Sequence, residues 1–264
     1  MDSGCSGGML ASMAGVKPSG IVTLLSDFGT QDAYVGAMKG VILRQNPRTN
    51  LVDITHDVQP FAVLQGAFLL DSAWSSFPAG TVHLAVVDPG VGSARPAIAM
   101  AGGEHFFVGP DNGLFTFVLE RIVAHAVALA VPTSASATFH GRDVFAPAAA
   151  QLAGGTPLER LGAPLATPSK LDEAWATRVG EGWRAHILHC DRFGNIITNL
   201  PASSVGRIHA VNGVAVRGVR TYGDASAGEL VVIAGSASRV EVAIREGSAA
   251  DRLHASPGDA IIVT

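Results

Sequence analysis

Short apolar runs that alternate with polar loops and helical patterns indicate repeated strand–loop–helix units in the N-terminal half of the chain. Ile21 to Leu25, Leu51 to Ile54 and Leu84 to Val87 are apolar runs of strand length, each ended by a polar loop. Between them, residues 33–44 and 62–76 repeat apolar side chains at helical spacing. Three such units in succession predict a mostly parallel sheet with right-handed crossovers and helices on its faces.

A hairpin and two further helices are expected next. Ala97 to Met100 and His105 to Val108 read as strands joined across a glycine pair. A helix is predicted from Leu114 to about Glu120, and an alanine-rich helix at residues 146–153. These elements would extend the same α/β unit.

The pattern changes after a stretch rich in proline, glycine and threonine at residues 154–182, which predicts a domain boundary. Short strands separated by turns follow, at residues 184–189, 196–199, 210–219, 230–234, 240–244 and 260–263. This spacing indicates a smaller antiparallel, barrel-like sheet. The predicted fold is therefore α/β, with an N-terminal domain at 19–165, a linker at 166–182 and a C-terminal β domain at 183–264.

Composition narrows the class of protein. Hydrophobic residues make up 48% and charged residues 15% of the chain, with mean hydropathy +0.33. No apolar run reaches the ~20 residues needed to span a bilayer, so the apolar excess is expected in a wide core or a subunit interface. A net charge of −4 argues against a nucleic-acid partner. Two cysteines are too few for a disulfide framework, which predicts a cytoplasmic protein.

Residues 1–18 are small, polar and glycine-rich, and they lack the basic start and apolar core of a signal peptide. We expect them to be a disordered leader or a cloning remnant.

The loop after the third strand carries the most chemistry, at Asp88-Pro89-Gly90-Val91-Gly92. Proline and glycine end the strand in a tight turn, which places Asp88 at the carboxyl end of a central strand, where open α/β sheets bind ligands. Arg95 follows within reach of the same edge. The pair is either a catalytic arrangement or anion clamp, or a structural ion pair that closes the loop.

Two earlier carboxylates, Asp27 and Asp32, occupy the loop after the first strand. An acidic residue at a strand end commonly binds a ribose diol in nucleotide-binding α/β folds, which fits Asp27. Asp32 precedes a predicted helix and is equally well interpreted as its N-cap. Asp111-Asn112-Gly113 is typical of a turn, but its side chains would face the same edge as Asp88.

Histidines offer two further candidates. His140 is the best general base in the sequence because imidazole titrates near neutral pH. The alternative is that the neighbouring Arg142 and Asp143 pair with each other and His140 only completes the packing. His56 has no second histidine at ligand spacing, so a hydrogen-bonded loop histidine is favoured over a metal ligand, and no metal site is expected.

In the C-terminal domain, the loop Asp191-Arg192-Phe193-Gly194-Asn195 combines a carboxylate, an aromatic face and an amide around a glycine. A second loop, Gly235-Ser236-Ala237-Ser238-Arg239, offers hydroxyls and backbone N–H groups, which alone is a weak signal.

Taken in order, these motifs identify a family. They are Ser26-Asp27-Phe28-Gly29-Thr30-Gln31-Asp32, Asp53-Ile54-Thr55-His56, Asp88-Pro89-Gly90-Val91-Gly92, Pro110-Asp111-Asn112-Gly113, His140-Gly141-Arg142-Asp143 and Asp191-Arg192-Phe193-Gly194-Asn195. Together they closely resemble the S-adenosylmethionine hydroxide adenosyltransferases, the adenosine-forming S-adenosylmethionine hydrolases. The resemblance runs from about Ile21 to Thr264.

The resemblance implies an α/β N-terminal domain, a small β-rich C-terminal domain, and a homotrimer that binds substrate between domains of neighbouring subunits. It also implies that water or hydroxide attacks ribose C5′ of S-adenosylmethionine, which yields adenosine and L-methionine without a cofactor. By residue, it places water activation at Asp88, Arg95 and His140, the ribose hydroxyls at Asp27, the methionine end at Asp32, Asp191 and Ser236, and the adenine or ribose at Asn195. Asp111, Asn112 and Phe193 are further candidate substrate contacts from the same motifs.

Two alternatives remain at this point. The fluorinating relatives carry a tyrosine at the position of Asp88, an aromatic residue at that of His140, and a long insertion where this chain has only residues 101–104. A carboxylate repels halide and favours water, so a halide-using enzyme is the less favoured alternative. The other is a regulatory module that binds S-adenosylmethionine or adenosine without turnover. The chain departs from the hydrolase pattern at Ser238 and Arg239, where glycine and an aromatic residue are expected.

Overall fold

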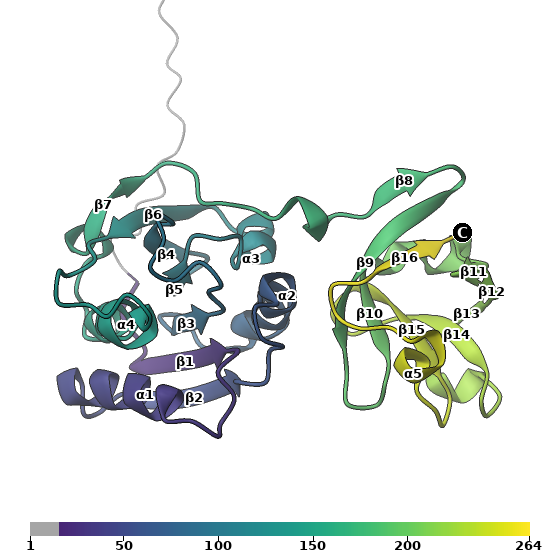
Figure 1. Ribbon diagram of the computed structural model, residues 1–264, viewed down its shortest axis with the longest axis horizontal. Coiled ribbons are helices and arrows are strands. Elements are labelled where there is room, and N and C mark those ends of the chain that lie inside the picture. Colours follow the sequence, from purple (N-terminus) through teal and green to yellow (C-terminus); the bar gives the residue numbers. More distant parts are fainter. Residues whose placement is uncertain (1–15) are drawn as a thin grey trace, which may run out of the picture.

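The computed structural model of the protein describes residues 16–264, which form two sheets in two separate units (Figure 1). The N-terminal unit is a sheet covered by helices, and the C-terminal unit is built almost entirely of strands.

The N-terminal sheet has seven strands in the order β2-β1-β3-β5-β4-β6-β7. They are β1 (Ile21–Ser26), β2 (Asn50–Thr55), β3 (Val82–Val86), β4 (Ala97–Gly102), β5 (His105–Pro110), β6 (Ala124–Leu129) and β7 (Gly162–Leu165). Strands β2, β1, β3 and β5 are mutually parallel, whereas β4 is antiparallel to both β5 and β6, and β7 is antiparallel to β6. The predicted mostly parallel sheet is confirmed, and β3 lies near its centre.

Helices cover both faces of this sheet. They are α1 (Tyr34–Gln45), α2 (Val63–Ala73) with the 3₁₀ turn η1 (Trp74–Ser76), α3 (Thr116–Arg121), and α4 (Ala146–Ala153), which continues the π-helical turn η2 (Gly141–Phe145). Helices α1 and α4 pack on one face, where Met38 and Ile42 meet Leu24 and its neighbours. Helices α2 and α3 pack on the other face. Because successive strand residues point to opposite faces, adjacent Leu24 and Leu25 belong to different cores.

The C-terminal sheet has the order β12-β11-β16-β9-β10-β15-β14-β13, with β8 paired to β9. Its strands are β8 (Thr177–Val179), β9 (Gly182–Cys190), β10 (Ile196–Pro201), β11 (Ala210–Val211), β12 (Val214–Ala215), β13 (Arg217–Val219), β14 (Leu230–Ala234), β15 (Arg239–Ile244) and β16 (Ala260–Val263). All its pairings are antiparallel except that of β13 with β14. The predicted barrel-like β domain is confirmed.

Short elements complete the chain. They are the 3₁₀ turns η3 (Leu158–Arg160), η4 (Asp172–Ala174), η5 (Ala202–Arg207) and η6 (Tyr222–Asp224), and helix α5 (Ala249–Leu253).

Several elements differ from the sequence-based expectation. Strands β6 and β7 were not predicted, because β6 is rich in alanine and β7 contains proline, which an edge strand tolerates. The single strand expected at 210–219 is wrong: the chain turns at Asn212 and Gly213, both with positive φ, and forms β11, β12 and β13. Helix α5 was also missed, although Ser248 caps it by accepting a hydrogen bond from the N–H of Asp251.

The predicted leader, residues 1–18, lies outside the described residues except for its last three. Val16 packs against the core that α1 and α4 share with the sheet, and the N–H of Ser19 donates to the carbonyl of Gly80 at 3.0 Å. Within residues 16–264, no helix combines the length and apolar character needed to cross a membrane.

Candidate active site

The loop that leaves β3 is folded tightly against the segment before His140. The N–H of Val91 donates to the carbonyl of Asp88, and Gly92 has φ +76°. A Cβ at Gly92 would lie 2.5 Å from the carbonyl oxygen of Ala137, so glycine is required for this approach. The loop thereby brings Asp88 close to η2.

Asp88 and Arg95 form a buried, two-pronged ion pair. Nε of Arg95 donates to Oδ1 of Asp88 at 2.8 Å, and Nη2 donates to Oδ2. The two side chains are 6% and 10% exposed. Arg95 also lies over the ring of Phe145, 5.3 Å from its centre. Both groups are therefore fixed in orientation by charge-assisted hydrogen bonds.

His140 joins this pair through Arg95. Its Nδ1 lies 3.1 Å from Nη2 of Arg95, and the side chain is buried at the start of η2. A guanidinium only donates, so Nδ1 must accept, and the neutral ring carries its proton on Nε2. Burial lowers the pKa of His140, the charge of Arg95 lowers it further, and Asp88 and Asp143 oppose them.

The alternative interpretation of this segment is half right. Arg142 and Asp143 do pair, with Nε to Oδ1 at 2.7 Å, but His140 contacts Arg95 as well. The structure thus brings together Asp88, Arg95 and His140.

Asp27 belongs to the same edge of the sheet. Its Oδ2 accepts a hydrogen bond from the N–H of Phe61 at 2.9 Å. Burial raises the pKa of Asp27, the backbone N–H groups of Phe61 and Asp27 oppose this, and the charge of Asp88 adds to the rise. A cavity of about 310 Å³ is lined partly by Phe28, the residue after Asp27, and by Tyr34 and Phe139. The centres of these three rings lie 5.1 to 6.1 Å apart.

The remaining N-terminal candidates, Asp32, Asp111 and Asn112, lie outside the group of Asp88, Arg95 and His140. Asp32 is exposed, and α1 is capped by Ala33 without a side-chain hydrogen bond, so the N-cap interpretation is wrong. Asp111 Oδ1 accepts from the N–H of Ser169 at 2.7 Å. Asn112 donates from Nδ2 to the carbonyl of Val87 at 2.9 Å. Contact of these three residues with substrate stays a prediction.

The C-terminal candidates form a second group around Asp191. Its carboxylate accepts from the N–H groups of Phe193 and Asn195 at 2.8 and 2.9 Å, and from Nδ2 of Asn195 at 2.9 Å. Asn195 is buried, whereas Phe193 is 78% exposed. A cavity of about 630 Å³ lies beside the three residues. Ser236 is exposed in the turn between β14 and β15.

Two residues of this region had no sequence signal. Tyr222 lines the same cavity and donates its hydroxyl proton to Oε1 of buried Glu241. Burial raises the pKa of Glu241, the hydrogen bond from Tyr222 opposes this, and the charge of Asp191 adds to the rise. An isolated tyrosine in a turn and a glutamate in an apolar strand carry no recognisable motif.

Arg239, where the chain departs from the hydrolase pattern, faces the N-terminal domain. Its guanidinium lies over the ring of Phe117 in α3, 4.9 Å from the centre, and Nη1 donates to the carbonyl of Asn199 at 3.2 Å. It therefore helps to hold the two domains together.

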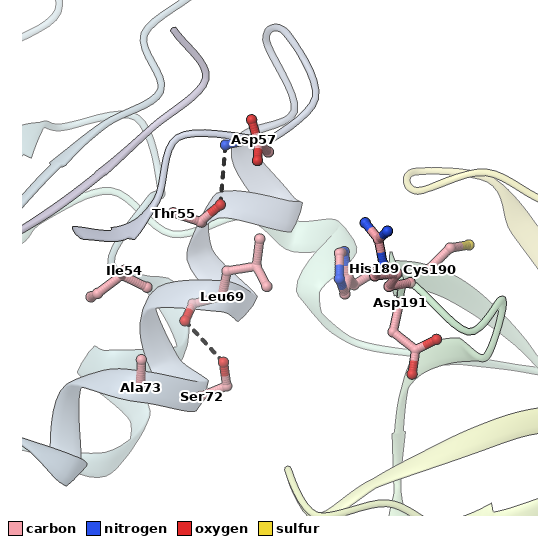
Figure 2. Close-up of a pocket in the computed structure, with 10 residues that line it drawn as sticks. Ile54, Thr55, Asp57, Leu69, Ser72, Ala73, His189, Cys190 and Asp191 are labelled. Atoms are coloured by element: carbon pink, nitrogen blue, oxygen red, sulfur yellow. Dashed lines mark hydrogen bonds between the residues drawn. The ribbon is translucent and has the colours of Figure 1, made fainter. Parts of the chain in front are cut away.

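A cleft of about 560 Å³ lies between the two domains (Figure 2). Thr55, Asp57 and Leu69 line one side, and the segment from His189 to Arg192 lines the other. Gln65 of α2 crosses the boundary, with Nε2 2.9 Å from Nδ1 of His189. Neither this cleft nor the Asp191 cavity is lined by Asp88, Arg95 or His140 in the described chain, so the candidates form two separate groups.

His56 is hydrogen-bonded through both ring nitrogens, to Ser26 at 2.7 Å and Asp53 at 3.0 Å. The interpretation as a hydrogen-bonded loop histidine is confirmed. From Val16 to Thr264, no three His, Cys, Asp or Glu side chains are grouped to hold a metal ion.

Residues 22–162 match the family model of the SAM hydroxide adenosyltransferase N-terminal domain, and residues 185–262 match that of its C-terminal domain. The chain belongs to the S-adenosylmethionine (SAM) hydroxide adenosyltransferase family. The Asp88 group lies in the first family domain and the Asp191 group in the second.

Relatives extend over nearly the whole chain. The family member from Salinispora tropica, named (R)-S-adenosyl-L-methionine hydrolase, is 42% identical over 94% of this chain and 99% of its own length. One of the same name from Thermus thermophilus is 44% identical over 90% and 96%. A crystal structure of an uncharacterized conserved protein from Thermotoga maritima superposes with a TM-score of 0.83 at 35% identity, over 92% of this chain and 99% of the other. A relative from Nocardia brasiliensis named fluorinase is more distant, at 29% identity.

Proposed function

We propose that this SAM hydroxide adenosyltransferase hydrolyses S-adenosyl-L-methionine to adenosine and L-methionine. The observation that carries the proposal is the buried contact of Asp88, Arg95 and His140 at the sheet edge that also holds Asp27. Relatives named (R)-S-adenosyl-L-methionine hydrolase support it, and their name points to the R epimer at sulfur as substrate.

The chemistry requires little from the leaving group. The C5′–S bond breaks to release a neutral thioether, so no acid is needed, and a C5′–O bond forms from water. Holding the water in line contributes roughly 7–11 kcal/mol, and a base within hydrogen-bond reach adds about 10²–10⁴-fold in rate. No metal or organic cofactor is needed for these steps, and we propose that none is used.

Asp88 is the proton acceptor in this proposal. The lone pair of His140 Nδ1 is engaged by Arg95, and Nε2 of the neutral ring already carries hydrogen. His140 is thus suited to donate a hydrogen bond and orient the water. Each Asp88 oxygen accepts one hydrogen bond from Arg95 and keeps a second acceptor site free for the water proton.

The two separate groups of candidates support a site shared between subunits of a homotrimer. The Asp88 group and Asp27 would bind water and the ribose of a substrate whose remaining parts contact the Asp191 group of a neighbouring subunit. Phe193 and Tyr222, both partly exposed beside the 630 Å³ cavity, offer aromatic faces for the adenine. The expected cytoplasmic location and the expected absence of nucleic-acid and membrane partners stay predictions.

The test is turnover in ¹⁸O-labelled water with each purified sulfonium epimer of S-adenosylmethionine. We expect the R epimer to yield adenosine labelled at the 5′ oxygen and unlabelled methionine. Bound substrate that returns unchanged would instead identify a regulatory binding module. A 5′-halogenated nucleoside formed in the presence of chloride or fluoride would identify a halide-using enzyme.

A further inference from the structure

Four side chains form a continuous hydrogen-bonded chain that runs from the surface of α1 to the loop of Asp27. Lys39 Nζ lies 2.6 Å from Asp53 Oδ2, and Asp53 Oδ1 lies 3.0 Å from Nε2 of His56. Nδ1 of His56 lies 2.7 Å from the hydroxyl of Ser26, the residue before Asp27. The motif Asp53-Ile54-Thr55-His56, which helps to identify the family, has no other role in the site described above.

The Asp53 carboxylate fixes the direction of the two hydrogen bonds that it accepts, from Lys39 and His56. Burial acts to raise the pKa of Asp53, but hydrogen bonds from Lys39 and His56 outweigh it and hold the pKa below its usual value. As a carboxylate, Asp53 only accepts, so Nε2 of His56 donates to it, and Nδ1 of the imidazole contacts the hydroxyl of Ser26. Ser26 Oγ in turn accepts from the N–H of Phe28 at 3.4 Å.

The backbone explains how His56 reaches this position. The pairing of β1 with β2 shifts by one residue at Ile54, since Leu24 pairs with Asp53 and Leu25 with Thr55. Such a bulge re-aims the residues that follow it. The carbonyl of His56 then accepts from the N–H of Gly29 at 2.8 Å.

The loop that carries Asp27 is therefore held by hydrogen bonds on both sides. On one side, His56 holds Ser26 through its ring and Gly29 through its carbonyl. On the other, Phe61, whose φ of +69° is unusual for a non-glycine residue, donates its N–H to the Asp27 carboxylate. All three contacts come from the segment that follows β2.

The Ser26, His56 and Asp53 set has the residue types of a serine-hydrolase triad but not its geometry. Ser26 is 0% exposed, so its hydroxyl cannot meet a substrate. The imidazole presents Nδ1 to the serine and Nε2 to the carboxylate, the reverse of the arrangement in that triad. The set is suited to holding a loop.

We propose that His56, oriented by Asp53 and Lys39, is a positioning residue that fixes the Asp27 carboxylate for a ribose carrying its 2′-hydroxyl. The chain thereby sets the selectivity of the site for ribonucleosides over 2′-deoxyribonucleosides. This inference rests on the proposed function, in which Asp27 binds the ribose. Hydrogen bonds from a hydroxyl to a carboxylate depend steeply on distance and angle, so a loosened loop loses them first.

The test is calorimetric binding of adenosine and 2′-deoxyadenosine to the full-length protein. Wild type is expected to prefer adenosine by about tenfold or more, the effect of one charge-assisted hydrogen bond. His56→Leu and Asp53→Asn should bring the ratio of adenosine affinity to 2′-deoxyadenosine affinity towards one. The affinity for 2′-deoxyadenosine itself should change less than about twofold. His56→Gln keeps one donor and one acceptor and should retain most of the preference.

The matched control is Glu120→Gln, which breaks the exposed ion pair of Glu120 with Lys170 at 2.7 Å. It imitates the loss of the Lys39–Asp53 ion pair in Asp53→Asn at a place far from the hydrogen-bonded chain. It should leave the ratio unchanged. An undiminished ratio in both His56→Leu and Asp53→Asn, or a wild type without preference, would overturn the proposal. Equal loss of both affinities would show a purely structural role and overturn it too. Because binding needs no turnover, a protein that discriminates without hydrolysis would refute the proposed reaction alone.

Discussion

Both oxygens of the Asp88 carboxylate accept hydrogen bonds from Arg95, which donates from Nε and from Nη2. The pair is nearly excluded from solvent, so its geometry does not depend on fluctuating water. Removing one partner would leave a buried charge without compensation. The chemistry proposed for this protein therefore depends on both members of this pair.

Asp88→Asn should abolish most turnover and leave binding. The amide keeps the size of the side chain but cannot take a proton from water, so kcat should fall by about 10²–10⁴-fold while KM changes little. Adenosine release measured by chromatography checks this. Asp172→Asn, at an exposed carboxylate in η4, is the control and should keep wild-type rates. Wild-type kcat in Asp88→Asn would refute the assignment.

The dependence of activity on pH should report the protonation of the His140 ring. Its pKa is lowered by burial and by Arg95, against Asp88 and Asp143, so the ring stays neutral to a pH below its ordinary value of 6.5. Protonation at Nδ1 would break the contact with Arg95. Activity is therefore expected to hold from pH 8 down through pH 6.5 and to fall only in more acidic buffer. A loss of kcat that begins above pH 7 would contradict this role for the imidazole.

Mixed subunits should reveal whether the site is shared. Under the proposed function, Asp88→Asn should inactivate the N-terminal half of a site and Asp191→Asn should weaken the C-terminal half. If each site combines halves from two subunits, a mixed oligomer contains some sites without either substitution. Such a site takes its N-terminal half from an Asp191→Asn subunit and its C-terminal half from an Asp88→Asn subunit. Refolding or co-expressing the two variants should then restore part of the activity that each lacks alone, measured as adenosine release per subunit. No recovery in demonstrably mixed oligomers would place the whole site in one subunit.

Phe193→Ala should weaken substrate binding. The ring is 78% exposed beside the Asp191 cavity, and stacking of a base on an aromatic side chain is worth about 1–3 kcal/mol, so KM should rise by roughly 5- to 150-fold. Val123→Ala removes another highly exposed apolar side chain, in the N-terminal domain, and should leave KM unchanged. An unchanged KM in Phe193→Ala would exclude the ring from the substrate site.

A buried histidine pair should make the fold sensitive to acid. His83 is fully buried, with Nδ1 2.8 Å from Thr23 Oγ1 and Nε2 3.1 Å from Nδ1 of His105. Burial, and then the charge of His105, lower the pKa of His83 to about 3 from 6.5. Between these two pH values the unfolded chain binds a proton that the folded chain does not. The free energy of unfolding should therefore decrease by about 1.4 kcal/mol for each unit by which the pH is lowered.

Burial also lowers the pKa of His105, opposed by Glu104, and this adds to the slope in the same direction. Urea unfolding at pH 7, 6 and 5 measures the slope. His83→Gln should reduce it, whereas His125→Gln, at an exposed histidine of β6, should not. Equal slopes in wild type and His83→Gln would mean that His83 titrates normally.

Local patterns were enough to predict most of the fold. Strands β1 to β5 and helix α4 follow from apolar periodicity and from glycine and proline at their ends, which act over a few neighbouring residues. Strand β7 and the break at Asn212 could not be predicted in this way. An edge strand contributes few buried side chains, and a positive φ at asparagine becomes evident only from the folded backbone.

The candidate site divides in the same manner. The motifs predicted that Asp88 and Arg95 would share one loop and that Asp191 and Asn195 would share another, because those partners are close in sequence. Arg95 and His140 are 45 positions apart, and only the packing of the β3 loop against the segment before η2 brings them to 3.1 Å. The hydrogen bond from Tyr222 to Glu241 likewise required the folded C-terminal sheet. Sequence determined which chemical groups the protein carries and where its strands end, whereas tertiary structure decided which of them touch, since contact between distant residues depends on the packing of every element between them.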